Sequence, residues 1–277
     1  MRTLSLKLAL AVLLALAAFL PALRASDAED PAEKPRIQIA LLLDTSGSMD
    51  GLIGQAKTQL WKIVNEFISA KRNGKRPEFE VALFEYGNDG LKKEDHWIRL
   101  VVPLTNDLDK VSQELFALKT NGGEEYCGAV IQAATERLAW SKNAKDLKTI
   151  YIAGNEPFSQ GPVKYQDACR KAIEKGITIN TIFCGPLAEG AQSGWKDGAA
   201  LADGAFINID QNRAMVQIDA PQDKEIAKLN EDLNKTYIAY GKHGAEGKAS
   251  QAAQEVNAAS AGQGSLSNRA LTKSSPL

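Results

Sequence analysis

Short apolar runs alternate along this chain with longer segments in which apolar residues recur at helical spacing. Such alternation is typical of parallel strands joined by helices that cross over the sheet. Several runs are apolar at consecutive positions, as strands are when both faces of their sheet are buried. The pattern predicts an α/β fold, a doubly wound, mostly parallel six-stranded sheet with helices on both faces, in a Rossmann-like arrangement. The expected strands are residues 37–43, 80–86, 97–104, 148–153, 177–184 and 205–209.

The segments between most of these strands have the periodicity of helices. The exception joins residues 80–86 to residues 97–104 and is too short for a crossover helix. That pair is expected to form a hairpin, which places one antiparallel edge strand in an otherwise parallel sheet. The expected helices are residues 53–68, a helix that follows the N-cap candidates Asn106 and Asp107, and residues 124–140, 162–175 and 223–236.

The first 25 residues have the pattern of a secretory signal peptide. Arg2 and Lys7 lie in a short basic start, residues 8–20 are uninterruptedly apolar, and small residues precede a cut after Ala25. An uncleaved membrane anchor is less favoured, because about 20 apolar residues are needed to cross a bilayer. The protein is therefore expected to be exported, periplasmic or secreted, with no stable membrane anchor after cleavage.

The rest of the chain divides by composition into four parts. A linker rich in proline and acidic residues covers residues 26–36, the α/β domain covers 37–212, and a C-terminal helical extension covers 213–242. Few large apolar residues follow, so residues 243–277 are expected to be a weakly ordered tail. A helix over residues 248–260 is the alternative for that tail.

Charge and motif content argue against two classes of function. The formal net charge is −1, and no stretch concentrates Lys and Arg, so neither a nucleic acid nor an anionic membrane is an expected partner. The sequence has no G-x-S-x-G motif, and its two histidines, His96 and His243, stand in polar segments. The usual machinery of nucleophilic catalysis is thus missing, and the protein is not expected to be an enzyme.

The loop after the first expected strand carries the most informative motif. Residues 44–49 read DTSGSM and stand between an apolar strand and an amphipathic helix. In this context the sequence resembles the von Willebrand factor A domain family. The resemblance covers about residues 37–212, and includes a Gly-Gly pair at 122–123 before a helix and the segment LADGAFINID before the last strand.

Asp44, Ser46 and Ser48 place a carboxylate and two hydroxyls at alternate positions of this loop, where they can converge above the strand ends. Hard oxygen donors of this kind suit Mg²⁺ or Mn²⁺, and open α/β sheets bind ligands at this edge. The resemblance implies a metal-ion-dependent adhesion site here. The alternative is that Asp44 and Ser46 only satisfy loop amides and the following helix N-terminus.

Two positions depart from the family's metal site. Glu124 follows the Gly-Gly pair where the family has Thr, and Gly154 stands where the family has an Asp at a strand end, with Asn155 and Glu156 beside it. The site is therefore degenerate, and Glu124 or Glu125 is expected to supply an internal carboxylate. The expected metal ligands are Asp44, Ser46, Ser48, Glu124 and Asn155.

For function, the resemblance implies a binding module whose loop face recognises another protein, with or without a cation. Two alternatives stay open at this point. One is a structural scaffold with a metal-free loop face, and the other is a metal-dependent hydrolase built on Asp44, Glu124 and Glu156.

The three cysteines allow two readings. Cys127 begins an expected helix beside the Gly-Gly pair and Cys184 ends an expected strand, so both should lie at one edge of the sheet. In an exported protein that placement favours a Cys127–Cys184 bridge, with three free thiols as the equal alternative. Cys169, within its helix, is expected to be a buried thiol.

Overall fold

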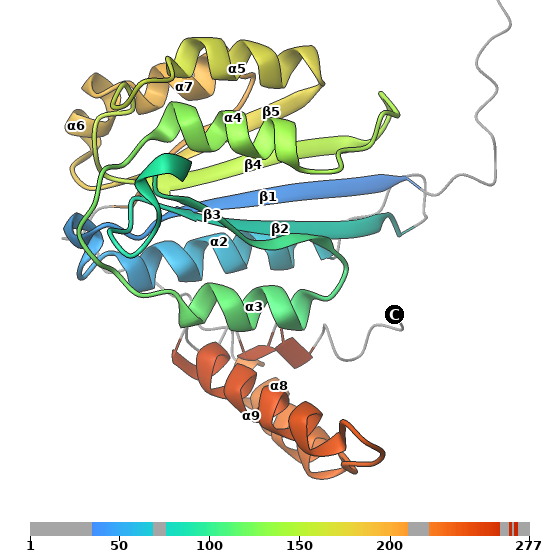
Figure 1. Ribbon diagram of the computed structural model, residues 1–277. Helices are drawn as coiled ribbons and strands as arrows, with labels where there is room; N and C mark the ends of the chain where they lie inside the picture. The colour runs from blue at the N-terminus through green and yellow to red at the C-terminus, as the bar shows by residue number, and fades with distance from the viewer. Residues whose placement is uncertain (1–34, 69–75, 210–221, 261–265, 268, 271–277) are drawn as a thin grey trace, which may run out of the picture. The chain divides into compact units, whose positions relative to one another are not determined.

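The computed structural model describes residues 35–68, 76–209, 222–260, 266–267 and 269–270 (Figure 1). The expected signal peptide, the linker up to residue 34 and the last seven residues of the tail, 271–277, lie outside the described residues. Within the described ranges, no helix is both long and apolar enough to cross a membrane.

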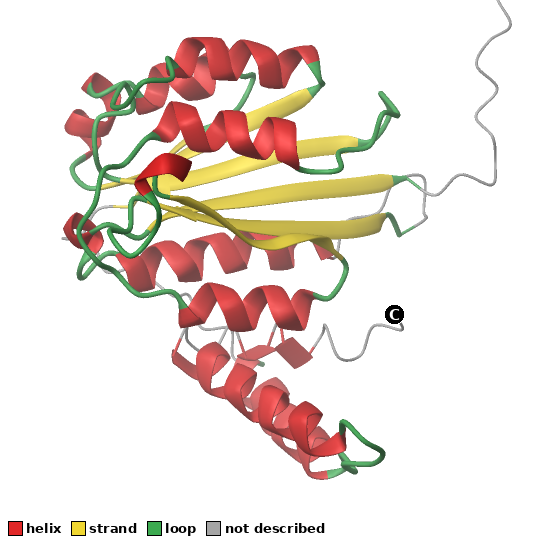
Figure 2. Cartoon of the chain, in the orientation of Figure 1, coloured by secondary structure: helices red, strands yellow, loops and turns green. Residues whose placement is uncertain are grey.

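Six strands form one mixed sheet (Figure 2). In chain order they are β1 Arg36–Asp44, β2 Glu78–Tyr86, β3 Ile98–Thr105, β4 Leu147–Gly154, β5 Ile177–Cys184 and β6 Phe206–Ile209. Their order across the sheet is β3-β2-β1-β4-β5-β6, the order of doubly wound nucleotide-binding folds. Strand β3 pairs antiparallel with β2, whereas all other pairs are parallel. The expected fold class, including the antiparallel edge strand, is confirmed.

Helices cover both faces of the sheet (Figure 1). In chain order they are α2 Ile53–Ile68, α3 Leu108–Ala117, α4 Cys127–Arg137, α5 Tyr165–Glu174, α6 Leu187–Gln192 and α7 Trp195–Leu201, with the 3-10 turns η2 Gly47–Met49 and η3 Lys93–Asp95. Helices α2 and α3 pack on one face, and α4, α5 and α7 pack on the other. The sheet therefore separates two hydrophobic cores.

The central strand β1 contributes to both cores. Ala40 and Leu42 pack with Val130 of α4, whereas Leu41 and Leu43 pack with apolar residues of α2 and α3. All five side chains are fully buried. Because successive side chains of a strand point to opposite faces, a strand covered on both sides can be apolar at consecutive positions, as β1 is from Ile39 to Leu43. This explains the continuous apolar run in the sequence.

The helices differ from the expected ones mainly at their ends and in the last crossover. Helix α4 begins at Cys127 rather than at residue 124. It ends at Arg137, after which the chain turns, with the Trp140 indole nitrogen donating to the Ala134 carbonyl at 2.9 Å. Helices α6 and α7, which lie between β5 and β6, were not expected. They are short, and Trp195 of α7 is fully buried.

The expected Cys127–Cys184 bridge is wrong for this structure, in which all three cysteines are free and buried. Cys127 belongs to the core under α4 and α5, whereas Cys184 belongs to the core on the opposite face of the sheet. Both lie near the carboxyl edge of the sheet, as expected, but the sheet itself stands between them. Cys169 is a buried thiol in α5, and its Sγ lies 3.6 Å from the Gly198 carbonyl oxygen.

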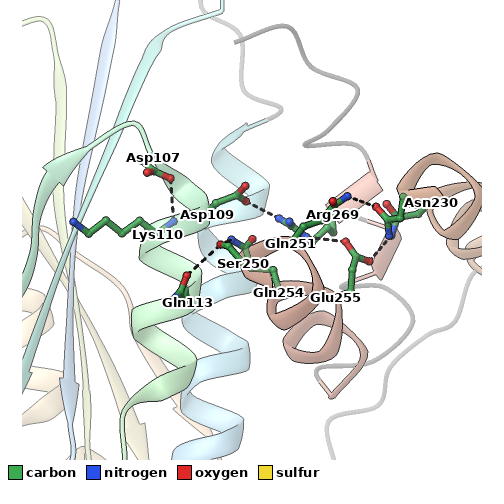
Figure 3. Close-up of polar contacts among 11 residues, drawn as sticks. Asp107, Asp109, Lys110, Gln113, Asn230, Ser250, Gln251, Gln254, Glu255 and Arg269 are labelled. Atoms are coloured by element: carbon green, nitrogen blue, oxygen red, sulfur yellow. Dashed lines mark hydrogen bonds and ion pairs between the residues drawn. The ribbon is translucent and has the colours of Figure 1, made fainter. Parts of the chain in front are cut away.

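Two further helices follow the sheet, α8 Asp223–Lys235 and α9 Gly244–Ser260. Helix α9 occupies a segment whose composition favours a weakly ordered tail, and it packs against α3. Polar contacts hold this region to α3: Ser250 Oγ of α9 donates to Gln113 at 3.2 Å, and Arg269, which follows α9 in the chain, donates to Asp109 at 2.6 Å (Figure 3). Polar attachment explains why few large apolar residues are needed there.

Candidate functional site

The candidate site lies at the carboxyl edge of the sheet, where β1, β2 and β4 end. Strand β1 ends at Asp44 and β4 ends at Gly154. The loop after β1 is tied to its neighbours through the backbone of Thr45: its N–H donates to the Tyr86 carbonyl at 2.9 Å, and its carbonyl accepts from the Asn121 N–H at 3.0 Å. The loops after β1 and β2 and the segment before α4 therefore meet around Asp44.

Asp44 lies at the centre of the site and has no exposed surface. One carboxylate oxygen, Oδ1, accepts a hydrogen bond from the Ser46 N–H at 2.8 Å. The other oxygen, Oδ2, is buried and has no hydrogen-bond partner. Burial raises the pKa of Asp44 to about 7, and the nearby carboxylates of Glu125 and Glu156 add to the rise, although hydrogen bonds from Ser46 oppose it. An orphaned buried oxygen is costly and calls for a proton or a cation.

Ser46, Ser48 and Asn155 continue the site outward from Asp44. Ser46 is fully buried, and its Oγ lies 2.9 Å from Ser48 Oγ. Ser48 is exposed, and it is joined to Asn155 twice: Ser48 Oγ donates to Asn155 Oδ1 at 3.0 Å, and Asn155 Nδ2 donates to the Ser48 carbonyl at 3.2 Å. Four of the five expected ligands, Asp44, Ser46, Ser48 and Asn155, thus lie together.

The fifth expected ligand, Glu124, does not join them, because it is exposed. Its neighbour Glu125 is 6% exposed and forms a side-chain hydrogen bond with Ser46. The amide nitrogen of Gln160, in the orientation that satisfies both groups, donates to Glu125 Oε2 and to the Glu125 carbonyl at 3.1 Å each. Burial raises the pKa of Glu125, and the charge of Glu156 adds to that rise. Of the two glutamates considered for the internal carboxylate, the structure brings in Glu125.

Two glycines allow the close packing around Asp44. A Cβ added at Gly87 would lie 2.8 Å from Asp44 Oδ1 and 3.0 Å from Glu125 Cγ, and its φ of +79° favours glycine as well. A Cβ added at Gly154 would lie 3.0 Å from Asp44 Oδ2 and 2.5 Å from Tyr86 Oη. Asp44 and Glu125 therefore approach the same point beside Gly87, and β4 cannot carry a side chain at its last residue.

The oxygen donors present fit a small divalent cation. Neighbouring ligands in an octahedral shell with bonds of about 2.1 Å lie about 3.0 Å apart, which is close to the separations of 2.9 Å and 3.0 Å along Ser46, Ser48 and Asn155. Asp44 and Glu125 add two carboxylates. No group of three or more His, Cys, Asp or Glu side chains with metal-binding geometry occurs in the described part of the chain, so such a site depends on hydroxyl and amide oxygens.

An aromatic cluster beside the site was not predicted from the sequence. The ring centroids of Trp97 and Tyr126 lie 5.5 Å apart, those of His96 and Tyr126 lie 6.0 Å apart, and Lys93 Nζ lies 5.9 Å from the Trp97 ring. His96 and Trp97 both have left-handed backbone conformations, with φ of 56° and 52°. No sequence pattern predicts this cluster, because the contact joins the β2–β3 connection to the residue before α4, and these segments are far apart in the chain.

Comparisons with known proteins give one family and several structural neighbours. A family model described as the von Willebrand factor type A domain matches residues 38–194. No curated protein matches the sequence.

Three similar solved structures represent the neighbours. Proximal thread matrix protein 1 from the mussel byssus, described with a zinc-occupied MIDAS motif, is 10% identical with a TM-score of 0.48, over 65% of this chain and 43% of its own. The conserved hypothetical protein BatB from Bacteroides thetaiotaomicron is 15% identical with a TM-score of 0.47, over 63% and 90%. The SpRpn10 VWA domain is 17% identical with a TM-score of 0.44, over 73% and 95%. The chain thus spans less than half the length of the mussel protein.

Proposed function

Because the chain belongs to the von Willebrand factor type A domain family, we propose that it is a binding module, not an enzyme, and that its loop face recognises another protein. The loop face is defined here as the surface of residues 45–50, 87–97, 118–126 and 155–161. Domains of this family commonly mediate protein interactions. The proposal adds that the partner contacts this face rather than the opposite edge of the sheet.

The observation that carries the proposal is the half-buried aromatic pair Trp97 and Tyr126 on the loop face. Trp and Tyr are enriched at the energetically important centres of protein interfaces, because each offers a large apolar area with a polar tip. Two consecutive left-handed residues, His96 and Trp97, hold the Trp97 ring there. Backbone strain of this kind is concentrated at functional sites.

A divalent cation, Mg²⁺ or Mn²⁺, belongs to this proposal. Asp44, Ser46, Ser48 and Asn155 would hold it, and its contribution would be to neutralise the carboxylates and to fix the loops of the face relative to one another. The metal-free scaffold is the competing view, and it predicts a loop face that neither metal nor partner alters.

Export also belongs to the proposal. The N-terminal segment has the features of a cleavable signal peptide, so the mature protein would meet its partner outside the cytoplasm. The mildly acidic chain, with a net charge of −1 over the full sequence, suits a protein partner better than a nucleic acid.

Site-specific photocrosslinking tests the proposed loop face. A photoreactive amino acid at exposed Glu124 reports on the loop face, and the same probe at exposed Lys142 reports on the loop before β4, at the opposite edge of the sheet. In the cells that make the protein, we expect the Glu124 probe to capture a discrete partner that the Lys142 probe does not. Trp97→Ala should weaken that capture, whereas Tyr240→Ala, an 88% exposed aromatic outside the face, should not. Equal capture at both probe positions would contradict the proposal.

A further inference from the structure

Three acidic groups at the candidate site, Asp44, Glu125 and Glu156, have no basic partner among the described residues. Asp44, Glu125 and Glu156 influence one another electrostatically, yet none of the ion pairs in the described residues joins a Lys or Arg to any of the three. Like charges at short range in a buried setting repel strongly, and the repulsion is relieved only by protons or by a cation.

An independent observation within the cluster indicates a cation. Asp44 Oδ2 is fully buried and has no hydrogen-bond partner. No donor or acceptor in the described structure forms a hydrogen bond with that oxygen, so the protein itself leaves it free to accept a cation. Asp44 Oδ2 is too deeply buried for a Lys or Arg side chain of a partner protein to approach, whereas a small cation can reach it.

Glu125 is positioned to complete such a site. It is held by hydrogen bonds with Ser46 and with the amide of Gln160. Its Cγ and Asp44 Oδ1 lie within 3.0 Å of one point beside Gly87. Gly154 carries no side chain and has no room for one, so the strand end supplies no second carboxylate, whereas Glu125 lies beside Asp44 at Gly87.

We infer that Glu125 is an internal ligand of a divalent cation held with Asp44, Ser46 and Ser48, so that the chain supplies both negative charges of the site itself. The inference deepens the proposed function at the same face. A cation bound in this way ties the segment before α4 to the loop after β1. It is retained without any carboxylate from a partner.

Metal titration tests Glu125 directly, and its neighbour Glu124 provides a matched control. Calorimetric titration of Mn²⁺ into the full chain should give one site in the wild type. Glu125→Gln should weaken its affinity at least about tenfold, because cation affinity in oxygen sites follows the number of charged ligands. Glu124→Gln removes the same charge from the neighbouring residue, whose side chain is exposed. It should change the affinity by less than about twofold, because an exposed charge is screened.

Thermal unfolding separates a ligand from a merely structural Glu125. Mn²⁺ should raise the Tm of the wild type and of Glu124→Gln more than that of Glu125→Gln. In EDTA, Glu125→Gln should be at least as stable as the wild type, because the substitution removes a like charge beside Asp44 and keeps the hydrogen bond with Ser46. A structural Glu125 would instead lose stability in EDTA.

Three results would overturn the inference: no Mn²⁺ binding by the wild type at millimolar concentration, equal affinities of wild type and Glu125→Gln, or equal losses in the two Gln variants. If Glu125→Gln fails to fold, Glu125→Asp replaces it, since a side chain shorter by one carbon keeps the charge but loses reach. Wild-type affinity in that variant would also overturn the inference. The crosslinking experiment with the probe at Glu124 does not depend on metal binding. It therefore distinguishes a loop face that binds a protein without a cation from a loop face that binds neither.

Discussion

Gly154 determines how much space surrounds Asp44. A Cβ at this position would lie 2.5 Å from Tyr86 Oη, 3.0 Å from Asp44 Oδ2 and 3.0 Å from Trp195 Cη2. All three neighbours are fully buried, so they cannot move aside without disturbing a close-packed core. The side chain of the Asp that the family carries at this strand end therefore has no space here. The close packing excludes a carboxylate at position 154.

Gly154→Ala is accordingly expected to destabilise the protein by about 1–3 kcal/mol, the usual cost of an overpacked core. Urea denaturation measures the change. Adding Tyr86→Phe should restore part of the loss, because it removes the nearest atom. Gly54→Ala is the control, since nothing lies within 4 Å of its added Cβ, and it should leave stability equal or higher. A Gly154→Ala protein as stable as the wild type would show that the site is looser than described.

Most of the candidate site could be predicted from the sequence, but its carboxylate could not be assigned to one residue. Asp44, Ser46 and Ser48 were identifiable because a strand, a tight loop and a helix follow one another directly there. The segment before Cys127 looked like the start of a helix, yet α4 begins only at that residue. Outside the helix, no helical period decides which of the two side chains turns inward, and the structure buries Glu125 and exposes Glu124.

At the scale of elements, the strands could be predicted, because burial on both faces of the sheet produces an apolar run that is visible in each strand's own sequence. The short helices α6 and α7 were not, since each is too short to give a period. The disulfide failed for a related reason: the sequence places Cys127 and Cys184 at one edge of the sheet, but not on a particular face of it. Cys184 lies within β5, where successive side chains alternate between the faces, and Cys127 lies in α4, which covers one face only.

The C-terminal helices depend on polar contacts that no hydrophobic pattern reveals. Arg269, whose side chain is 7% exposed, donates to Asp109 of α3 at 2.6 Å and to Glu255 of α9 at 3.1 Å (Figure 3). Asn230 of α8 donates to the other oxygen of Glu255 at 2.6 Å. A single buried guanidinium thus joins α3 to α9, and through Glu255 it is linked to α8.

Arg269→Ala should loosen α8 and α9 while leaving the sheet intact. A hydrogen bond between charged groups contributes about 1.5–3 kcal/mol, and the substitution removes the bonds from Arg269 to Asp109 and to Glu255. Hydrogen exchange is expected to speed up in α8 and α9 and to stay unchanged in β1 and β4. Lys235→Ala serves as the control, because its ion pairs within α8 are exposed and such pairs contribute little. Faster exchange throughout the sheet would mean that Arg269 stabilises the whole domain instead.

At the scale of the whole molecule, the three free thiols are compatible with the proposed export. Burial raises the pKa of Cys169 to about 12 and raises the pKa of Cys127 and Cys184 further above the ordinary range. The thiolate is the reactive form, so these buried thiols stay protonated and out of reach of oxidants. An oxidising compartment would therefore leave the folded protein with three thiols.

The N-terminal segment is expected to be removed on export. The protein recovered outside the cytoplasm should begin at Ser26, or after Ala28 if the alternative cut is used. The apolar run of residues 8–20 has the length expected of a signal peptide. At 1.5 Å per residue, a helix of that length would fall short of the about 30 Å of hydrocarbon in a bilayer. N-terminal sequencing of the exported protein measures the cut. Leu14→Arg places a charge within the run and should leave uncleaved precursor in the cytoplasm, whereas Leu187→Arg, on a 59% exposed surface residue, should not. Exported protein that still carries Met1 would contradict cleavage, and wild-type processing of Leu14→Arg would show that the run is not the targeting signal.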